Sequence, residues 1–566
     1  MEQVNQNSII NEIDELYERE AKEKRVLAQL LERYTNLQGR YLATRGEMGV
    51  HTTAGGKQFR TPSFVVSHDL SWLASHMKMG SEMSFMRTYI GNDGKLKIDE
   101  SNVDELKQRQ PDWSRQASLT AYLVADKMRK FGTILAVVSP DWVNQPEHEN
   151  WGRDGRALKG AIQFEPLDQQ GRVGLLNLSE GFVYALDGQH RVMGIRGVKE
   201  LIENHFTLKN KHGIGDAEKV PQEEFLNFFN LELGQLESLL SERMHVEYIP
   251  AVLAGETREE ASRRLRSVFF AINSHAKKPT KGENLTLDEV DGYSLVARRV
   301  GVRHSLFKGS SGSRINWKGS SLPERSEWFT TLEALKEMTR VFLEKANPGL
   351  AKRWHPPVEL GIKSAIFRPP EDELDAASVQ VTEFFGHMMM LPVFQGLLAS
   401  TEVTKELAEA RAFPDADSEY PNGRGHLLLR PVGQIVLAAA VGRLVNPSAK
   451  DRMTVEEVFK IISQLDSAGR FEAHRPENIW YGVTYNFHKK KMDVALSHRE
   501  LAIRLLMYLV RGADEAERIS LLREVISKRE VEGSWLPFSG GKPVSVQKDE
   551  SGLISVVGHN LPLPRQ

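Results

Sequence analysis

The stretch that decides the fold runs from Gly181 to His205 and reads GFVYALDGQHRVMGIRGVKELIENH. The apolar run that ends at Leu186 indicates a buried strand, and the Asp-Gly pair after it is a strong turn signal. Beyond the turn, three apolar residues recur at helical spacing: Ile195, Val198 and Ile202. We therefore predict a strand, a tight turn and a helix, with the polar residues gathered where the strand meets the helix.

The polar residues of this junction suit a phosphate ligand. A helix that begins directly after a strand presents unpaired backbone N–H groups and the positive end of its dipole. Gly188 lets a ligand approach the backbone, Arg191 offers a forked cationic donor, and His190 can exchange a proton near neutral pH. Asp187 could hold a divalent cation or orient Arg191. We take Asp187, His190 and Arg191 as candidate catalytic residues and Asp187 as the candidate metal ligand.

The alternative for the same junction is a purely structural turn in which Asp187 caps the helix. Burying a histidine and an arginine costs several kcal/mol unless both are paired, so five polar or small residues are a poor choice for such a turn. We therefore favour a functional site.

Two motifs link the sequence to a known family. Residues 187–191 form a complete DGQHR motif, and residues 268–279 read VFFAINSHAKKP. On these motifs the chain resembles the DGQHR-domain family, which includes DndB of DNA phosphorothioation systems. Arg115, ahead of a predicted helix and strand, fills the place of an arginine that the family tends to carry upstream. The resemblance covers roughly residues 40–345.

More distantly, the turn is similar to the phosphate-contacting box of the ParB and sulfiredoxin superfamily. That similarity implies nucleotide binding, with ATP as the first ligand to expect and Mg²⁺ as its companion ion, at Gly188, Gln189 and Arg191. Asn273 and Lys277, at the end of the second motif, would add contacts to the nucleotide. The alternative for these two residues is a solvated helix end, whose negative dipole suits lysines.

Composition limits the protein class. A chain of 566 residues with 40% hydrophobic and 27% charged residues is expected to form two to four globular domains. The formal net charge of -2 gives no general attraction to nucleic acid, so any DNA contact must use a local basic patch. The absence of cysteine excludes disulfides and thiolate chemistry. Without a leader-like start or an apolar run of 18 residues, we expect a cytoplasmic protein that does not enter a membrane.

The pattern along the chain predicts an α+β fold. We expect a ParB/sulfiredoxin-like mixed α/β core that carries the DGQHR turn, followed by a mainly α-helical C-terminal half. The expected parts are an amphipathic helix (1–40), the core domain (41–300), a helical extension (301–410), a C-terminal helical domain (425–530) and a tail (531–566). The first helix either packs on its own domain or self-associates as a short coiled coil, which would give a homo-oligomer. Residues 209–222 look like an exposed loop.

Two basic stretches are candidate DNA contacts. Arg303 and Arg314 lie in a glycine- and serine-rich stretch, and Lys489, Lys490 and Lys491 follow a run rich in aromatic residues. For both stretches, an ordinary solvated surface is the alternative. The arginines of residues 258–266 alternate with glutamates, which is typical of a salt-bridged surface helix.

Three functions remain open at this point. The first is a regulatory or accessory protein of DNA modification or phage defence that binds nucleotide and DNA and works with other modification proteins. The second is an enzyme, either an ATPase or a nuclease effector, or the partner of a base-replacing modification enzyme. The third is a scaffold in which the motif is structural. Walker A, HExxH and GxSxG motifs are absent, so P-loop, zinc-protease and serine-hydrolase chemistry are unsupported.

Overall fold

The computed structural model describes residues 16–30, 33, 39–52, 56, 58–83, 111–203, 205–213, 215–275, 279–309, 312–323, 326–365, 367–414, 420–475, 478–486, 489–531, 534–535, 545–548 and 554–557. The chain divides into two compact units. We call Met1–Lys277 with Pro357–Ser364 the α/β unit, and Lys278–Pro356 with Ala365–Gln566 the helical unit.

An eight-stranded mixed sheet forms the centre of the α/β unit, with the order β3-β7-β4-β10-β2-β1-β6-β5. Its strands are β1 (Arg40–Thr52), β2 (Gln58–Asp69), β3 (Met77–Met79), β4 (Ile134–Ser139), β5 (Gln163–Pro166), β6 (Val173–Asn177), β7 (Phe182–Asp187) and β10 (Arg243–Pro250). β7 pairs parallel with β3 and antiparallel with β4, while β4 pairs parallel with β10. The strand that carries the DGQHR residues therefore lies inside the sheet, with a neighbour on each side.

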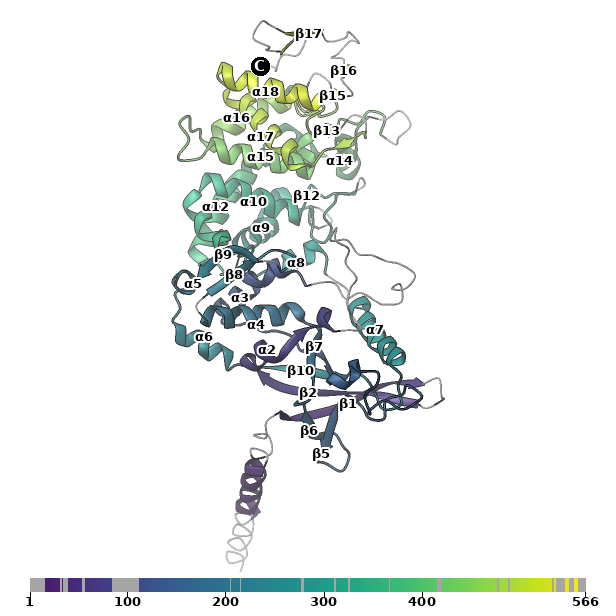
Figure 1. The fold of residues 1–566 in the computed structure, drawn as a ribbon. Helices are drawn as coiled ribbons and strands as arrows, with labels where there is room; N and C mark the ends of the chain where they lie inside the picture. Colours follow the sequence, from purple (N-terminus) through teal and green to yellow (C-terminus); the bar gives the residue numbers. More distant parts are fainter. Residues whose placement is uncertain are drawn as a thin grey trace, which may run out of the picture. The chain divides into compact units, whose positions relative to one another are not determined.

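Helices cover this part of the sheet because the inner strands β4 and β7 are apolar on both faces. The unit contains α2 (Leu70–His76), α3 (Gln116–Ala125), α4 (Gln189–Ile202), α5 (Gln222–Phe229), α6 (Leu233–Leu240) and α7 (Arg258–His275). Every residue of β4 is buried. Leu135 and Val137 share a core cluster with Ala261 and Leu265 of α7. Successive residues of a strand point to opposite faces, so the even-numbered residues of β4 face the other side. Helix α4 packs against α2, α3 and α6 (Figure 1).

The helical unit has one continuous apolar core that runs from α9 to α18. Its helices are α8 (Lys281–Leu287), α9 (Gly292–Arg303), α10 (Leu332–Ala346), α11 (Pro348–Trp354), α12 (Glu371–Met389), α13 (Pro392–Ala399), α14 (Val403–Arg411), α15 (Pro431–Leu444), α16 (Val455–Ser467), α17 (Leu496–Arg511) and α18 (Glu515–Arg529). Short strand pairs are β11 (Ile315–Asn316) with β12 (Thr330–Thr331), and β13 (Tyr485–Asn486) with β14 (Lys491–Met492). Helix α15 is buried almost all round, which explains its nearly continuous apolar sequence.

These observations confirm an α+β fold with a helical C-terminal half. The more specific ParB/sulfiredoxin-like core stays a prediction, as does the five-part division of the chain. The predicted boundary at residue 300 falls inside α9, whose apolar residues belong to the core of the helical unit.

Residues 209–222 are not the exposed loop that their composition indicated. Strand β8 (His205–Lys209) pairs antiparallel with β9 (Gly215–Pro221), and the partners include Phe206 with Val220. Backbone hydrogen bonds between strands need no apolar side chains, so a polar stretch can still form a hairpin.

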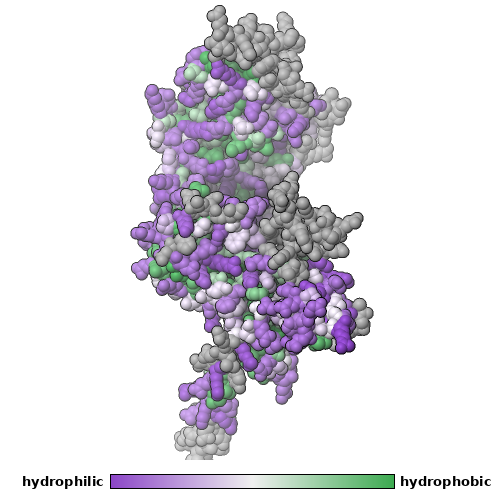
Figure 2. All heavy atoms as spheres, in the orientation of Figure 1, coloured by the Kyte–Doolittle hydropathy of each residue, from purple (hydrophilic) through white to green (hydrophobic). Residues whose placement is uncertain are grey.

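The N-terminal segment is helical over residues 16–30, in agreement with the predicted amphipathic helix. Its apolar side chains, among them Leu16, Leu27 and Leu30, are exposed in the described part of the chain. Self-association through this helix stays a prediction. Figure 2 shows a described surface that is largely hydrophilic, broken by small groups of apolar residues. Within the described residues, no helix has the length and apolarity needed to cross a membrane.

Candidate functional site

The DGQHR residues lie where β7 ends and α4 begins, as the sequence predicted. Gly188 is the N-cap of α4 and has a φ of 90°, in the left-handed region that favours glycine. A Cβ atom there would lie 3.0 Å from Nη1 of Arg191 and 3.1 Å from Cγ1 of Ile134. Both the backbone angle and the crowding therefore require glycine at this turn.

Arg191 is tied to the strand beside it. Its Nη1 donates a hydrogen bond of 2.7 Å to the carbonyl oxygen of Thr133, and the same atom lies 3.8 Å from Oδ2 of Asp187. The side chains of Arg191 and Asp187 are 31% and 42% exposed. Among the described residues, the Arg191 guanidinium makes no other recorded hydrogen bond, so several of its N–H donors are open to a ligand.

His190 is held as a neutral acceptor. The backbone N–H of Asp112 donates to its Nε2 at 3.3 Å, which places the ring proton of the neutral form on Nδ1. Burial and then the nearby charge of Arg115 lower the pKa of His190, and the carboxylates of Asp112 and Asp187 oppose that shift. Any proton transfer by this histidine would therefore have to use Nδ1.

Gln189 leaves a buried polar atom unsatisfied. The residue is 9% exposed, and its Oε1 has no hydrogen-bond partner among the described residues. A buried acceptor without a donor typically costs about 1–3 kcal/mol. A ligand group or a water molecule that donates to this oxygen would remove that cost.

A cleft of about 410 Å³ lies beside the site, and the sequence did not indicate it. It is lined by Trp113 of the short 3-10 helix Trp113–Arg115, by β8 residues, and by three lysines, Lys209, Lys211 and Lys363. Lys209 is engaged, because its Nζ lies 2.7 Å from Oε1 of Glu200. Lys211 and Lys363 are exposed and form no recorded ion pair among the described residues.

The structure brings Arg115 and the DGQHR residues together. Arg115 is separated from His190 by 74 residues of sequence yet contributes to its pKa shift, and it forms no ion pair with the described residues. The family resemblance had singled out this arginine. The one sequence signal for Lys211 was its position two residues after Lys209, in a stretch whose composition indicated a loop.

The second motif is described in part, because residues 268–275 belong to α7 and residues 276–278 lie outside the described residues. Asn273 belongs to α7, but its side chain lies outside the described residues, as does Lys277 altogether. The interpretation of residues 258–266 as a surface helix is wrong for Arg264, which is 3% exposed. Its Nε lies 2.7 Å from Oε1 of Glu256, and its Nη2 donates to the carbonyl oxygens of Pro250 and Ala251. Glu256, just before the helix, and the two carbonyl oxygens at the end of β10 hold this arginine inside.

The predicted DNA contacts belong to the helical unit. Arg303 is exposed in the last turn of α9. Arg314 donates to the carbonyl oxygen of Lys308 and lies over the ring of Phe329 at 5.1 Å, so part of its hydrogen-bonding capacity holds its own loop. Lys489, Lys490 and Lys491 are exposed at the β13–β14 hairpin, where Lys490 has a φ of 45°.

A metal site is not evident from the protein groups alone. No cluster of three or more His, Asp or Glu side chains suited to a metal ion occurs within the described residues. Mg²⁺ commonly binds through one or two carboxylates together with phosphate oxygens, so Asp187 fits a metal that arrives with a nucleotide better than a resident one.

Comparison with known proteins identifies a family. The family model DndB, described as DNA-sulfur modification-associated, matches residues 56–356, which is more than half of the chain. No curated protein and no solved structure matches. The matched range contains the whole DGQHR junction, the cleft residues up to Lys211 and the second motif.

Proposed function

This chain belongs to the DndB family of DNA-sulfur modification-associated proteins, and on that premise we propose that it is a regulatory or accessory factor of DNA phosphorothioation. In this proposal it binds a nucleotide at the DGQHR turn, contacts DNA and works with other DNA-modification proteins. Hydrolysis of the nucleotide is not part of the proposal.

Nucleotide binding is supported mainly by the guanidinium N–H groups near His190 that form no hydrogen bond with the described residues. Arg191 donates one hydrogen bond, to Thr133, and its other nitrogens form none with the described residues. The side chain of Arg115 forms no hydrogen bond or ion pair with the described residues, although its charge acts on Asp112. Arg191 lies in the first turn of α4, a helix of 14 residues whose N-terminal end attracts anions. Arg115 lies close enough to this turn for its charge to lower the pKa of His190. Guanidinium groups bind phosphate oxygens in pairs, which favours a phosphate over a single carboxylate.

The neighbouring groups indicate how a nucleotide would be held. The phosphates would lie on the first turn of α4 between Arg191 and Arg115. Asp187 would share a Mg²⁺ ion with phosphate oxygens and thereby help to neutralise their charge. The cleft beside the site offers Lys211 for a further phosphate and the ring of Trp113 as an apolar surface.

DNA contact is assigned to exposed cations of the helical unit. Arg303 and the three consecutive lysines 489–491 are exposed, and phosphate contacts of this kind position a protein on DNA without reading its sequence. Binding through such contacts should weaken as salt rises.

The nucleotide proposal is tested by titrating ATP with Mg²⁺ into the full chain and its variants, followed by calorimetry. Arg191→Ala should weaken binding by at least about tenfold, because losing a charge-assisted phosphate contact costs about 1.5–3 kcal/mol. Arg115→Ala should have an effect of similar size. Arg172→Ala is the matched control, because the Arg172 side chain is 71% exposed and pairs with Asp168, and this variant should bind ATP like the parent.

The outcome that contradicts the proposal is an ATP affinity that neither arginine variant changes in folded protein. Release of inorganic phosphate, measured in the same samples with and without DNA, separates a binding protein from an ATPase. Steady release that is lost in His190→Ala would favour the enzyme.

A further inference from the structure

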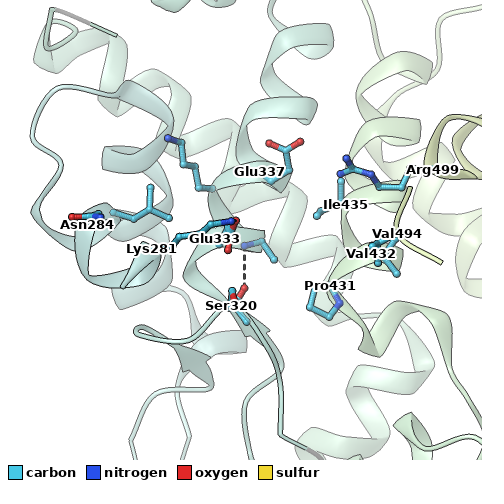
Figure 3. Close-up of a pocket in the computed structure, with 14 residues that line it drawn as sticks. Lys281, Asn284, Ser320, Glu333, Glu337, Pro431, Val432, Ile435, Val494 and Arg499 are labelled. Atoms are coloured by element: carbon cyan, nitrogen blue, oxygen red, sulfur yellow. Dashed lines mark hydrogen bonds and ion pairs between the residues drawn. The ribbon is translucent and has the colours of Figure 1, made fainter. Parts of the chain in front are cut away.

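A second cavity, of about 790 Å³, lies within the helical unit and includes none of the site residues that the sequence indicated. Four helices supply its walls: α8, α10, α15 and α17. In Figure 3, Lys281 and Asn284 approach it from one side, Glu333 and Glu337 from α10, and Arg499 from α17. Its volume falls within the 300–1,000 Å³ that is usual for small-molecule sites.

One wall of this cavity is apolar. Pro431, Val432 and Ile435 line it from α15, and Leu285 and Val494 add to the same lining. Val494 is 65% exposed and stands at the rim. A wall of this kind suits the hydrophobic or ring portion of a ligand.

Most charges around the cavity already have partners. Lys281 lies 3.1 Å from Glu333, and Lys336 lies 2.9 Å from Asp291. Glu337 accepts two hydrogen bonds from one neighbouring arginine, at 2.7 and 2.9 Å. These groups are therefore neutralised within the protein.

Arg499 is the exception. Its side chain reaches from the first turns of α17 toward Glu337, above Ile435 (Figure 3). Its Nε is buried and has no hydrogen-bond partner, and the guanidinium forms no ion pair with the described residues. Arg340 holds the nearby carboxylate of Glu337 on two nitrogens. The charge of Arg499 also helps to lower the pKa of Glu337, so two arginines share this one carboxylate. An anionic group that enters the cavity would therefore be stabilised by the charge of Arg499.

The backbone adds to the same preference. Thr331, the N-cap of α10, and Pro431, the first residue of α15, both line the cavity. The N-terminal ends of these helices, of 15 and 14 residues, carry partial positive charge. These two helix ends add positive potential to the cavity that Arg499 faces.

We propose that this cavity binds a small organic anion about the size of a nucleoside monophosphate, with its anionic group on Arg499 and its ring body against α15. Asn284, Ser320 and Thr331 offer hydrogen-bonding groups for the polar edges of such a ring or sugar. The site is separate from the DGQHR turn and does not depend on the function proposed for that turn.

The test titrates adenosine monophosphate into the full chain by calorimetry. Every sample carries Arg191→Ala, so that the DGQHR turn contributes little. Arg499→Ala should weaken binding by at least about tenfold, and Arg499→Lys should restore part of it. Arg504→Ala is the matched control, because this arginine lies on the same helix but pairs with Glu524, and it should leave the affinity unchanged.

Two further measurements separate the parts of the ligand. Adenosine lacks the anion and inorganic phosphate lacks the ring, so each should bind at least about tenfold more weakly than adenosine monophosphate. Val494→Trp should also weaken binding, because a large ring at the rim narrows the entrance without altering any charge. An affinity that survives both Arg499→Ala and Val494→Trp, or the absence of any binding to the folded Arg191→Ala chain, would overturn the proposal. Loss of ATP binding in the separate Arg191→Ala test bears only on the turn.

Discussion

The DGQHR junction and the cavity of the helical unit differ in how their arginine side chains are hydrogen-bonded. Arg191, the most conspicuous cation of the sequence, donates to the carbonyl oxygen of Thr133 and lies beside Asp187. Arg499, which no sequence motif marks, faces a cavity and forms no hydrogen bond or ion pair with the described residues through its side chain, although its charge acts on Glu337. The difference teaches that a residue of a motif can use part of its hydrogen-bonding capacity on the fold, while a residue outside any motif can keep hydrogen-bonding groups without a protein partner.

This comparison predicts that replacing a charged residue lowers the free energy of unfolding most where its charge is buried against an opposite charge. Glu256 and Arg264 form an almost fully buried ion pair, whose side chains are 5% and 2% exposed. Glu256→Gln should lower the free energy of unfolding by about 3–5 kcal/mol, because it leaves the arginine charged and buried without its carboxylate. Urea denaturation followed by tryptophan fluorescence measures the loss.

Glu259→Gln is the control for this change. Glu259 is exposed in the first turn of α7, the helix that carries Arg264. Its substitution should therefore alter the free energy of unfolding by no more than about 0.5 kcal/mol. Equal midpoints for the two variants would show that the buried pair contributes little.

Histidines extend the comparison to groups that are neutral in the fold. Burial lowers the pKa of His68 to about 3, and its ring stacks on Trp72 at 3.9 Å. Below pH 6.5 the unfolded chain takes up a proton that the folded chain refuses, so stability falls as the pH drops from 6.5 toward 3. At pH 4.5 the loss from this residue should be about 2–3 kcal/mol.

The measurement is the free energy of unfolding at pH 7 and pH 4.5. His68→Phe keeps a ring for stacking and should remove most of the acid-induced loss, whereas His212→Phe, at an exposed position, should retain it. His190 has a depressed pKa with the same sign of effect. If His68→Phe loses as much stability in acid as the parent, the buried ring is not the source.

The smallest expected changes in stability are those of the alanine variants of Arg191 and Arg499. Arg191→Ala removes a charge-assisted hydrogen bond and should lower the free energy of unfolding by about 1 kcal/mol, a value reduced from the usual range because the side chain is 31% exposed. Arg499→Ala removes no recorded partner and should stay within about 0.5 kcal/mol of the parent. Thermal unfolding of both variants measures the two losses of stability. An equal fall in Tm would show that the two arginines contribute equally to stability and would contradict the prediction.

Local sequence was sufficient for much of the fold. The Asp-Gly turn, the apolar run before it and the helical spacing after it specify β7, Gly188 and α4 because each signal acts over a few residues. The hairpin of β8 and β9 was missed, because strand pairing depends on backbone partners rather than on side-chain pattern.

By itself, then, the sequence determined the strand–turn–helix junction, the helical C-terminal half and, through its motifs, a resemblance to a family that the family match confirms. Only the tertiary structure decided which arginines are buried, paired or left facing a cavity. Arg264 and Arg499 look alike along the chain, since both lie in helices that carry further arginines and a glutamate. Their fates differ because the energy of a charge depends on its burial and on groups brought from distant segments, and periodicity contains neither quantity.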